Sequence, residues 1–300
     1  MRLMSDLKNE NVWHLCTPGS FSGLLFRCRE DFVFGMNMVA LSVHQSDGIG
    51  IYTFELMNNH VHFVLEGEED CVRDFFERFR FNCFRMWCDN AGVSNVRVIE
   101  PNLLRIDSLR YLQNLIVYVN RNGYVVDESV TPFSYPWGAN SFFFNGLRDF
   151  VFARKFADLG GREKRAMFKK REVVLPDDWD IIDDYVSPMS FCKIDVAEGL
   201  FMSAHHYFSS ITKNIESFKE IAIELGDGVF YTDNDLFRIA AQIASSCYKT
   251  AEIAQLGKKA KIEMAIRLRK EYNASRKQLC RVLKLDTGTV DSLFPNLRKY

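Results

Sequence analysis

The chain has 300 residues, of which 47% are hydrophobic and 14% aromatic, and its formal net charge is −1. This composition supplies enough apolar surface for a packed core and excludes a disordered chain, while the net charge gives no global attraction to nucleic acid. The length suggests about two domains. The sequence shows neither the apolar core of a signal peptide nor a run near the ~18 apolar residues of a membrane span, so we expect no membrane partner.

The eight cysteines form no Cys-x-x-Cys pair, which favours reduced thiols over a zinc ribbon. In the N-terminal part, strands and helices are expected to alternate. The apolar patterns predict strands at 11–17, 48–56, 60–66 and 96–99, with helices at 29–45 and from Glu68 onward. The second and third strands are too close for a crossover and should pair as an antiparallel hairpin. His14, in the first strand, is more simply explained as a core or sheet-surface histidine, with approach to a substrate as the alternative.

Two histidines, His60 and His62, flank one apolar residue in the third predicted strand. Side chains two residues apart on a strand lie on the same face, roughly 6.5–7 Å apart. Two imidazoles at that spacing can converge on one divalent ion that polarises a phosphate. Taken alone, such a pair is more often a pair of hydrogen-bonded or half-exposed histidines.

A further helix is expected over 108–122, with Ser108 as its N-terminal cap and Gly123 as its C-terminal cap. Tyr118 and Asn122 lie one turn apart on the same face of this helix. The simpler interpretation of Tyr118 is a half-buried aromatic residue.

The segment 154–171 holds eight Lys or Arg residues and is expected to be a mobile basic connector, either solvated or binding phosphates. Its candidate DNA-binding residues are Arg154, Lys155, Lys169, Lys170 and Arg171. The segment 175–226 carries little pattern. Its acidic cluster at 177–184 is best explained by a solvated turn.

Four helices are expected in the last third, at 233–249, 260–272, 275–283 and 287–294, and the final two, joined by a tight turn, have the outline of a helix-turn-helix. Residues 255–300 contain twelve Lys or Arg and four Asp or Glu, a local charge of about +8 that favours phosphate contacts. The candidate residues are Arg276, Lys277, Arg281 and Lys284. A protein-binding helical bundle with a basic surface is the alternative.

The stretch Met57-Asn58-Asn59-His60-Val61-His62-Phe63-Val64-Leu65 resembles the "M-x-N-H-x-H-hydrophobic" signature of single-tyrosine HUH transposases, and the resemblance is closest to their REP-associated branch. Tyr118-Val119-Asn120-Arg121-Asn122-Gly123 stands where that family reads roughly Tyr-Ile-x-x-Asn-Pro. Tyr135-Pro136-Trp137 matches a further family motif. The resemblance covers about residues 10–145, and Gly123 departs from the usual proline.

The resemblance implies an α+β fold, in which a ferredoxin-like HUH domain with a central antiparallel sheet occupies 1–150. A basic connector and mixed helical segment would occupy 151–228, and an all-α helix-turn-helix domain 229–300. By this resemblance, His60, His62 and Asn122 would hold Mg²⁺ or Mn²⁺, and Tyr118 would be the nucleophile.

The activity implied is cleavage and joining of single-stranded or hairpin DNA during transposition, by a possible homodimer in the cytoplasm of a bacterium, associated with the nucleoid. Two alternatives stay open from the residues. One is a DNA-binding regulator that keeps the fold without cutting DNA. The other is a metal-dependent phosphoesterase that uses water instead of a tyrosine.

Overall fold

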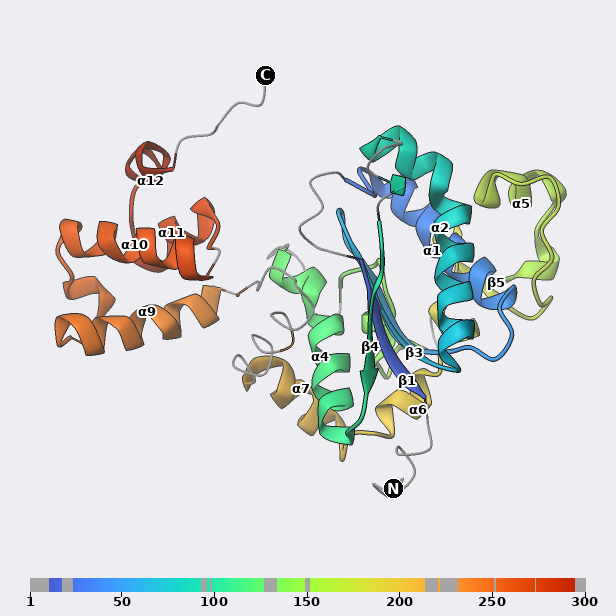
Figure 1. Ribbon diagram of the computed structural model, residues 1–300, viewed down its shortest axis with the longest axis horizontal. Helices are drawn as coiled ribbons and strands as arrows, with labels where there is room; N and C mark the ends of the chain where they lie inside the picture. The colour runs from blue at the N-terminus through green and yellow to red at the C-terminus, as the bar shows by residue number, and fades with distance from the viewer. Residues whose placement is uncertain are drawn as a thin grey trace. The chain divides into compact units, whose positions relative to one another are not determined.

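A computed structural model describes residues 11–17, 24–92, 96–97, 99–126, 134–148, 152–213, 221, 231, 233–250, 252–272 and 274–294. The chain divides into two compact units, Met1–Asp227 and Gly228–Tyr300. Figure 1 labels the helices and strands of each unit. Within the described residues, every helix is too short or too polar to cross a membrane.

A four-stranded antiparallel sheet forms the centre of the first unit, which confirms the predicted α+β class. The strands follow the order β2-β3-β1-β4, and every neighbouring pair is antiparallel. Their bounds are β1 (Val12–Cys16), β2 (Gly50–Leu56), β3 (Val61–Glu66) and β4 (Asn102–Ile106). The expected hairpin of β2 and β3 is present, and the central strands β1 and β3 place Cys16 opposite His62.

Helices cover both faces of this sheet. Figure 1 shows α2 (Glu69–Ala91) and α4 (Leu109–Val126) on opposite sides of the strands, with α1 (Arg29–His44) beside α2. Phe63 of β3 packs edge-on against Phe75 and Phe79 of α2, with ring centroids 5.2 and 5.3 Å apart. The preceding residue, His62, faces Tyr118 of α4 instead. Strand alternation therefore puts aromatic core on one face and histidines on the other.

Two predicted element boundaries were wrong. Val96 and Arg97 are helical rather than extended, and the fourth strand instead lies beyond Pro101, at Asn102–Ile106, where it pairs with β1. Helix α4 continues through Gly123 to Val126 instead of ending there. A glycine inside a helix costs only about 1 kcal/mol relative to alanine, and the helix tolerates it here.

The segment after residue 151 folds as part of the first unit and is not merely a connector. It contains a small sheet in the order β5-β6-β7. Its elements are β5 (Arg154–Lys155), α5 (Gly161–Phe168), β6 (Asp180–Ile182), β7 (Tyr185–Val186), α6 (Ile194–Glu198) and α7 (Ala204–Lys213). Buried Asn37 of α1 fastens the β6–β7 turn by donating to the Asp184 carbonyl (3.0 Å) and accepting from the Val186 amide (3.0 Å).

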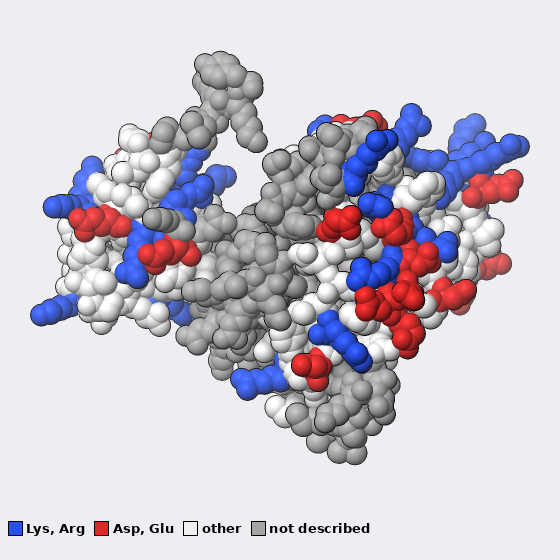
Figure 2. Space-filling model, in the orientation of Figure 1, with Lys and Arg blue, Asp and Glu red and all other residues white. Residues whose placement is uncertain are grey.

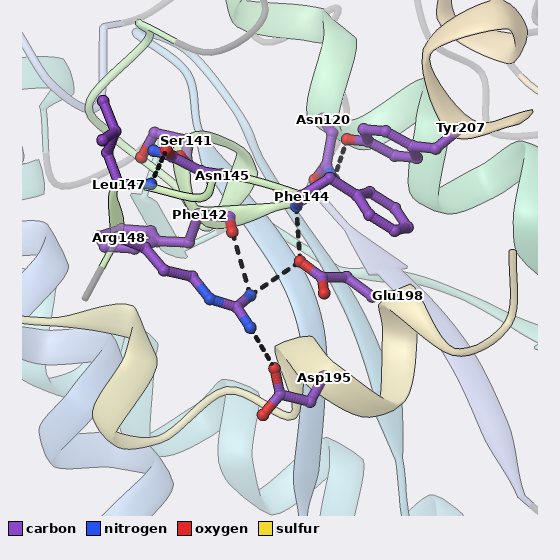
Figure 3. A network of polar contacts seen from close by, with 10 residues as sticks. All are labelled: Asn120, Ser141, Phe142, Phe144, Asn145, Leu147, Arg148, Asp195, Glu198 and Tyr207. Carbon is purple, nitrogen blue, oxygen red and sulfur yellow. Dashed lines mark hydrogen bonds and ion pairs between the residues drawn. The ribbon is translucent and has the colours of Figure 1, made fainter. Parts of the chain in front are cut away.

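Short 3-10 turns connect these elements, at Asn140–Phe142, Phe156–Asp158 and Pro188–Ser190, with a fourth in the second unit at Ile253–Gln255. Arg148 fixes the first of them to α6 (Figure 3). Its guanidinium donates to Glu198 (2.8 Å), to Asp195 (2.6 Å) and to the Phe142 carbonyl (3.3 Å). Glu198 also accepts the Phe144 amide hydrogen at 2.5 Å, so one partly buried carboxylate orders the loop that precedes residue 149.

The second unit is helical, and its helices lie close to the predicted positions. They are α9 (Asp233–Tyr248), α10 (Lys258–Tyr272), α11 (Arg276–Leu283) and α12 (Thr287–Leu293). Ser275 and Gln278 form a reciprocal capping box at the start of α11. Asp286 caps α12 by accepting the Thr289 amide hydrogen at 2.8 Å. Between them Lys284 adopts a left-handed conformation, with φ at 54°, and makes the turn tight.

Candidate functional site

Polar side chains from two strands and a helix meet between the sheet and α4. His14 and Cys16 project from β1 and His62 from β3, and all three are fully buried. The two strands pair so that Cys16 lies opposite His62 and His14 opposite Val64. Because side chains two residues apart share a face, this register brings the two histidines and the thiol onto one side of the sheet.

The imidazoles of His14 and His62 contact each other directly. Nε2 of His14 lies 3.2 Å from Nδ1 of His62, and the rings stack with centroids 5.3 Å apart and an interplanar angle of 9°. One of these nitrogens must carry the hydrogen and the other must accept it. The contact therefore links the tautomer of His62 to that of His14.

His14, Cys16 and His62 form a group that can hold a metal ion. One imidazole nitrogen from each histidine and the Cys16 sulfur all lie within 4.8 Å of one another. Among the predicted ligands only His62 belongs to this group. The sequence carried a signal for the other two, since His14 and Cys16 are spaced two apart on a strand. It became meaningful only when that strand was seen to pair with the strand of His62.

The predicted ligands His60 and His62 are neighbours in space. Their rings meet edge to face, with centroids 4.8 Å apart. His60 precedes β3, is buried, and places its Nδ1 2.8 Å from the side-chain oxygen of Asn59. Asn122, the third predicted ligand, is buried on α4 one turn beyond Tyr118. The structure thus brings the rings of His60 and His62 together.

Tyr118, the predicted nucleophile, packs against the histidine group. Its ring lies edge-on to His62, with centroids 5.8 Å apart and an interplanar angle of 88°. The residue is only 6% exposed. The phenol is thus close to the histidines and shielded by its neighbours, so a large substrate must displace some of the covering side chains to reach it.

Burial keeps both central imidazoles neutral. Desolvation lowers the pKa of His62 to about 3. Desolvation, and secondly the nearby His62, lower the pKa of His14 well below its usual value of 6.5. At neutral pH each ring therefore keeps a lone pair on one nitrogen, as a metal ligand requires.

Asn120, which the sequence did not single out, holds α4 in place. Its side-chain oxygen accepts the Thr53 hydroxyl hydrogen of β2 at 2.5 Å. Its amide nitrogen donates to the Tyr207 hydroxyl of α7 at 2.8 Å, as Figure 3 shows. Tyr207 in turn stacks on Phe143, with ring centroids 5.7 Å apart. Asn120, two residues after Tyr118, therefore fixes the position of α4 against the sheet.

Replacing Asn120 by alanine is expected to lower the free energy of unfolding by about 2 kcal/mol, because two buried hydroxyls lose their partner at once. Denaturant titration of the full chain measures this loss. Tyr207→Phe removes only one of the two hydrogen bonds and should cost about half as much. A loss under about 0.5 kcal/mol for Asn120→Ala would show that the bridge does not stabilise the unit.

The predicted DNA-binding residues of 154–171 are mostly engaged within the fold. Figure 2 shows Lys and Arg side chains gathered over α5, with acidic side chains beside them. Arg154 pairs with Glu163 (2.8 Å) and Lys155 with Asp180 (2.7 Å). Lys169 lies over the Phe34 ring, with its Nζ 4.6 Å from the ring centroid, and Lys170 donates to Asn82 at 2.7 Å. Arg171 is exposed.

Of the four candidate residues of the second unit, two form ion pairs with described residues and two do not. Arg276 pairs with Asp291 (2.9 Å) and Arg281 with Asp233 (2.5 Å). Lys277 and Lys284 are exposed, and neither has an ion-pair partner among the residues that the structure describes. These two lysines are therefore the better placed of the four to meet a phosphate.

Comparison of the chain with protein-family models, with curated proteins and with solved structures finds no match. The arrangement of these side chains and the motifs around His60, His62 and Tyr118 are therefore the features that bear on function.

Proposed function

We propose that the first unit cleaves and rejoins single-stranded or hairpin DNA through a covalent 5′-phosphotyrosine at Tyr118, with a divalent cation held by His60, His62 and Asn122. The observation that carries the proposal is the contact between the Tyr118 and His62 rings, 5.8 Å apart, which joins two motifs more than fifty residues apart. Such an enzyme would serve DNA transposition.

The arrangement of the sheet supports the finer fold assignment. Strands and helices alternate as β1-α1-β2-β3-α2-β4 along the chain, and the strands lie in the order β2-β3-β1-β4. A ferredoxin-like domain has the same βαββαβ sequence of elements. In this arrangement β1 and β3 are central, so the histidines of both strands lie in the middle of the sheet face that α4 covers.

In the proposed reaction Tyr118 and the histidines have different roles. Tyr118 attacks the phosphorus, and the bond from its phenolic oxygen replaces the bond to the 3′ oxygen, which leaves as a free hydroxyl after taking up a proton. The covalent link conserves the energy of the broken phosphodiester, so joining needs no ATP. A cation bound by the histidines would withdraw charge from the scissile phosphate. Because one tyrosine holds one cut end, coupled cleavages require a second copy of the chain or successive turnovers.

The proposed ligands suit the cation that the motif implies. His60 and His62 offer nitrogens and Asn122 a carbonyl oxygen, a mixed set that suits Mn²⁺ and, with solvent ligands, Mg²⁺. When Nδ1 of His62 donates its hydrogen to His14, Nε2 carries the lone pair and can serve the same cation as His60. His14 is then a positioning residue that fixes the orientation and tautomer of His62.

We infer that the second unit adds affinity for DNA as a helix-turn-helix, because α11 and α12 are joined by a tight turn. Exposed lysines stand at both ends of α11, with Lys277 in its first turn and Lys284 directly after its last residue. Lys277→Gln and Lys284→Gln should each reduce the slope of log K against log salt by about 0.9, as expected for the loss of one phosphate contact. Fluorescence anisotropy over a salt series measures the slope. Arg276→Gln is the matched control, since its carboxylate partner leaves it less available and the slope should stay unchanged.

The proposal is tested with labelled hairpin DNA that carries a single-stranded flank. The full chain is incubated with this DNA and Mg²⁺ or Mn²⁺, and products are separated on denaturing gels. A protein–DNA adduct with release of a free 3′-OH fragment supports the proposal. Binding without cleavage would identify the non-cutting regulator, and cleavage that yields no adduct would identify a phosphoesterase that uses water.

A further inference from the structure

We propose that His14, Cys16 and His62 form a binding site for a thiophilic divalent cation of the Zn²⁺ class, distinct from the His60-containing set (His60, His62 and Asn122), with which it shares only His62. The site lies on the two central strands of the sheet, and its three residues are fully buried. The inference goes beyond strand cleavage and does not require that Tyr118 react with DNA.

The spacing of the nitrogens fits a tetrahedral ion. With metal–nitrogen bonds of about 2.0–2.1 Å, two nitrogens at adjacent corners of a tetrahedron lie roughly 3.3 Å apart. Nε2 of His14 and Nδ1 of His62 are 3.2 Å apart. The distance between these nitrogens therefore matches that of two ligands on one ion. On binding, the ring that carries the hydrogen between them takes the other tautomer, with its hydrogen on the far nitrogen, so the imidazoles release no proton.

The sulfur needs a small adjustment. A nitrogen and a thiolate sulfur on one tetrahedral ion lie about 3.6 Å apart, given a metal–sulfur bond near 2.3 Å. All ligating atoms of the group lie within 4.8 Å of one another. The Cys16 sulfur is thus near enough for a side-chain adjustment to complete the set.

The donor types select the ion. A thiolate with two imidazoles is a soft set that favours Zn²⁺ or Co²⁺, whereas Mg²⁺ requires oxygen ligands. Three protein ligands leave one tetrahedral position open. Binding requires Cys16 to lose its thiol proton to solvent, so the ion and the thiolate together carry one positive charge.

A carboxyl group lies where it can offset that charge. Glu55 of β2 pairs with His62 across the strands, and its side chain is fully buried. A carboxylate near a metal-bound histidine is a common outer partner that raises the basicity of the ligand. A thiol, a carboxyl group and two imidazoles buried together therefore fit a site for a divalent cation better than they fit an apolar core.

This site and the His60-containing set use different nitrogens of His62. The thiophilic ion takes Nδ1, which faces His14, whereas a cation shared with His60 takes Nε2. The two sites therefore respond differently to replacement of His14, Cys16 and His60, and this difference makes them separable by experiment.

The experiment titrates Co²⁺ into the metal-stripped full chain, in which the exposed Cys28 and Cys247 are replaced by serine to remove adventitious thiols. We expect one bound Co²⁺, a thiolate-to-cobalt band in the near ultraviolet, and loss of the band on adding Zn²⁺. Cys16→Ser should abolish the band, and His14→Ala should weaken binding at least tenfold. Cys83→Ser, at another buried thiol, and His60→Ala should retain the band.

Proton release gives a second measurement that needs no variant. Zn²⁺ added to the same weakly buffered protein should release about one proton per ion as Cys16 ionises. The proposal is overturned if the wild-type ligand set produces no thiolate band and no proton release, or if the band depends on His60 and not on Cys16. Circular dichroism of each variant establishes that it is folded, and none of these readouts depends on DNA cleavage.

Discussion

Replacing Tyr118 by phenylalanine should abolish the covalent protein–DNA adduct and lower strand cleavage by at least about 10³-fold, because the substitution removes the attacking oxygen and nothing else. The aromatic ring keeps its contact with His62, so the fold should persist. We expect the free energy of unfolding to change by about 1 kcal/mol, the typical contribution of one hydroxyl hydrogen bond. Denaturing gels quantify the adduct, and anisotropy shows whether DNA affinity is unchanged.

Tyr111 provides the matched control, because it lies on the same helix, two turns before Tyr118. Tyr111→Phe makes the same chemical change on α4 and should leave adduct formation within about twofold of the parent protein. Persistent cleavage by the Tyr118→Phe protein would reject a tyrosine nucleophile and favour a water-based phosphoesterase. Loss of the adduct in both variants would show that the assay reports the stability of α4 rather than the chemistry.

Acidification should destabilise the metal-free protein through its buried histidines. Burial lowers the pKa of His62 to about 3, below the value of about 6.5 expected in the unfolded chain. The unfolded state therefore binds the extra proton first, and the stability is complete above pH 6.5 and falls as the pH drops toward 3. At pH 4 this residue alone should lower the free energy of unfolding by roughly 3 kcal/mol relative to pH 7.

His14 should add to the effect, since its pKa is lowered in the same direction by burial and by His62. Urea titrations at pH 7 and pH 4, with EDTA present, measure the difference. His62→Gln, which does not titrate, should flatten the pH dependence, whereas the same change at exposed His205 should leave it intact. An equal loss on acidification in the His62→Gln and parent proteins would place the acid sensitivity elsewhere.

Local pattern was enough to locate several elements. The apolar spacing placed α1, β2, β3 and the helices of the second unit near their observed positions, because periodicity reflects which side chains face a core. It failed at 96–99, where the apolar residues suited a strand, whereas residues 102–106 are the ones that pair with β1. Strand pairing is a long-range choice that a short apolar run does not encode.

The sequence by itself determined that His60 and His62 are two residues apart beside a strand, that Tyr118 and Asn122 are one helical turn apart, and that positive charge gathers near the C-terminus. These are local relations, set by the geometry of a strand or a helix.

Only the tertiary structure decided which of these residues meet. Pairing of β1 with β3 brought His14 and Cys16 to His62, and the packing of α4 brought Tyr118 to the same ring. Tertiary packing also buried this group and thereby set the low pKa of His62. The physical reason is that burial, register and contact depend on residues far apart in the chain, and no local spacing records them.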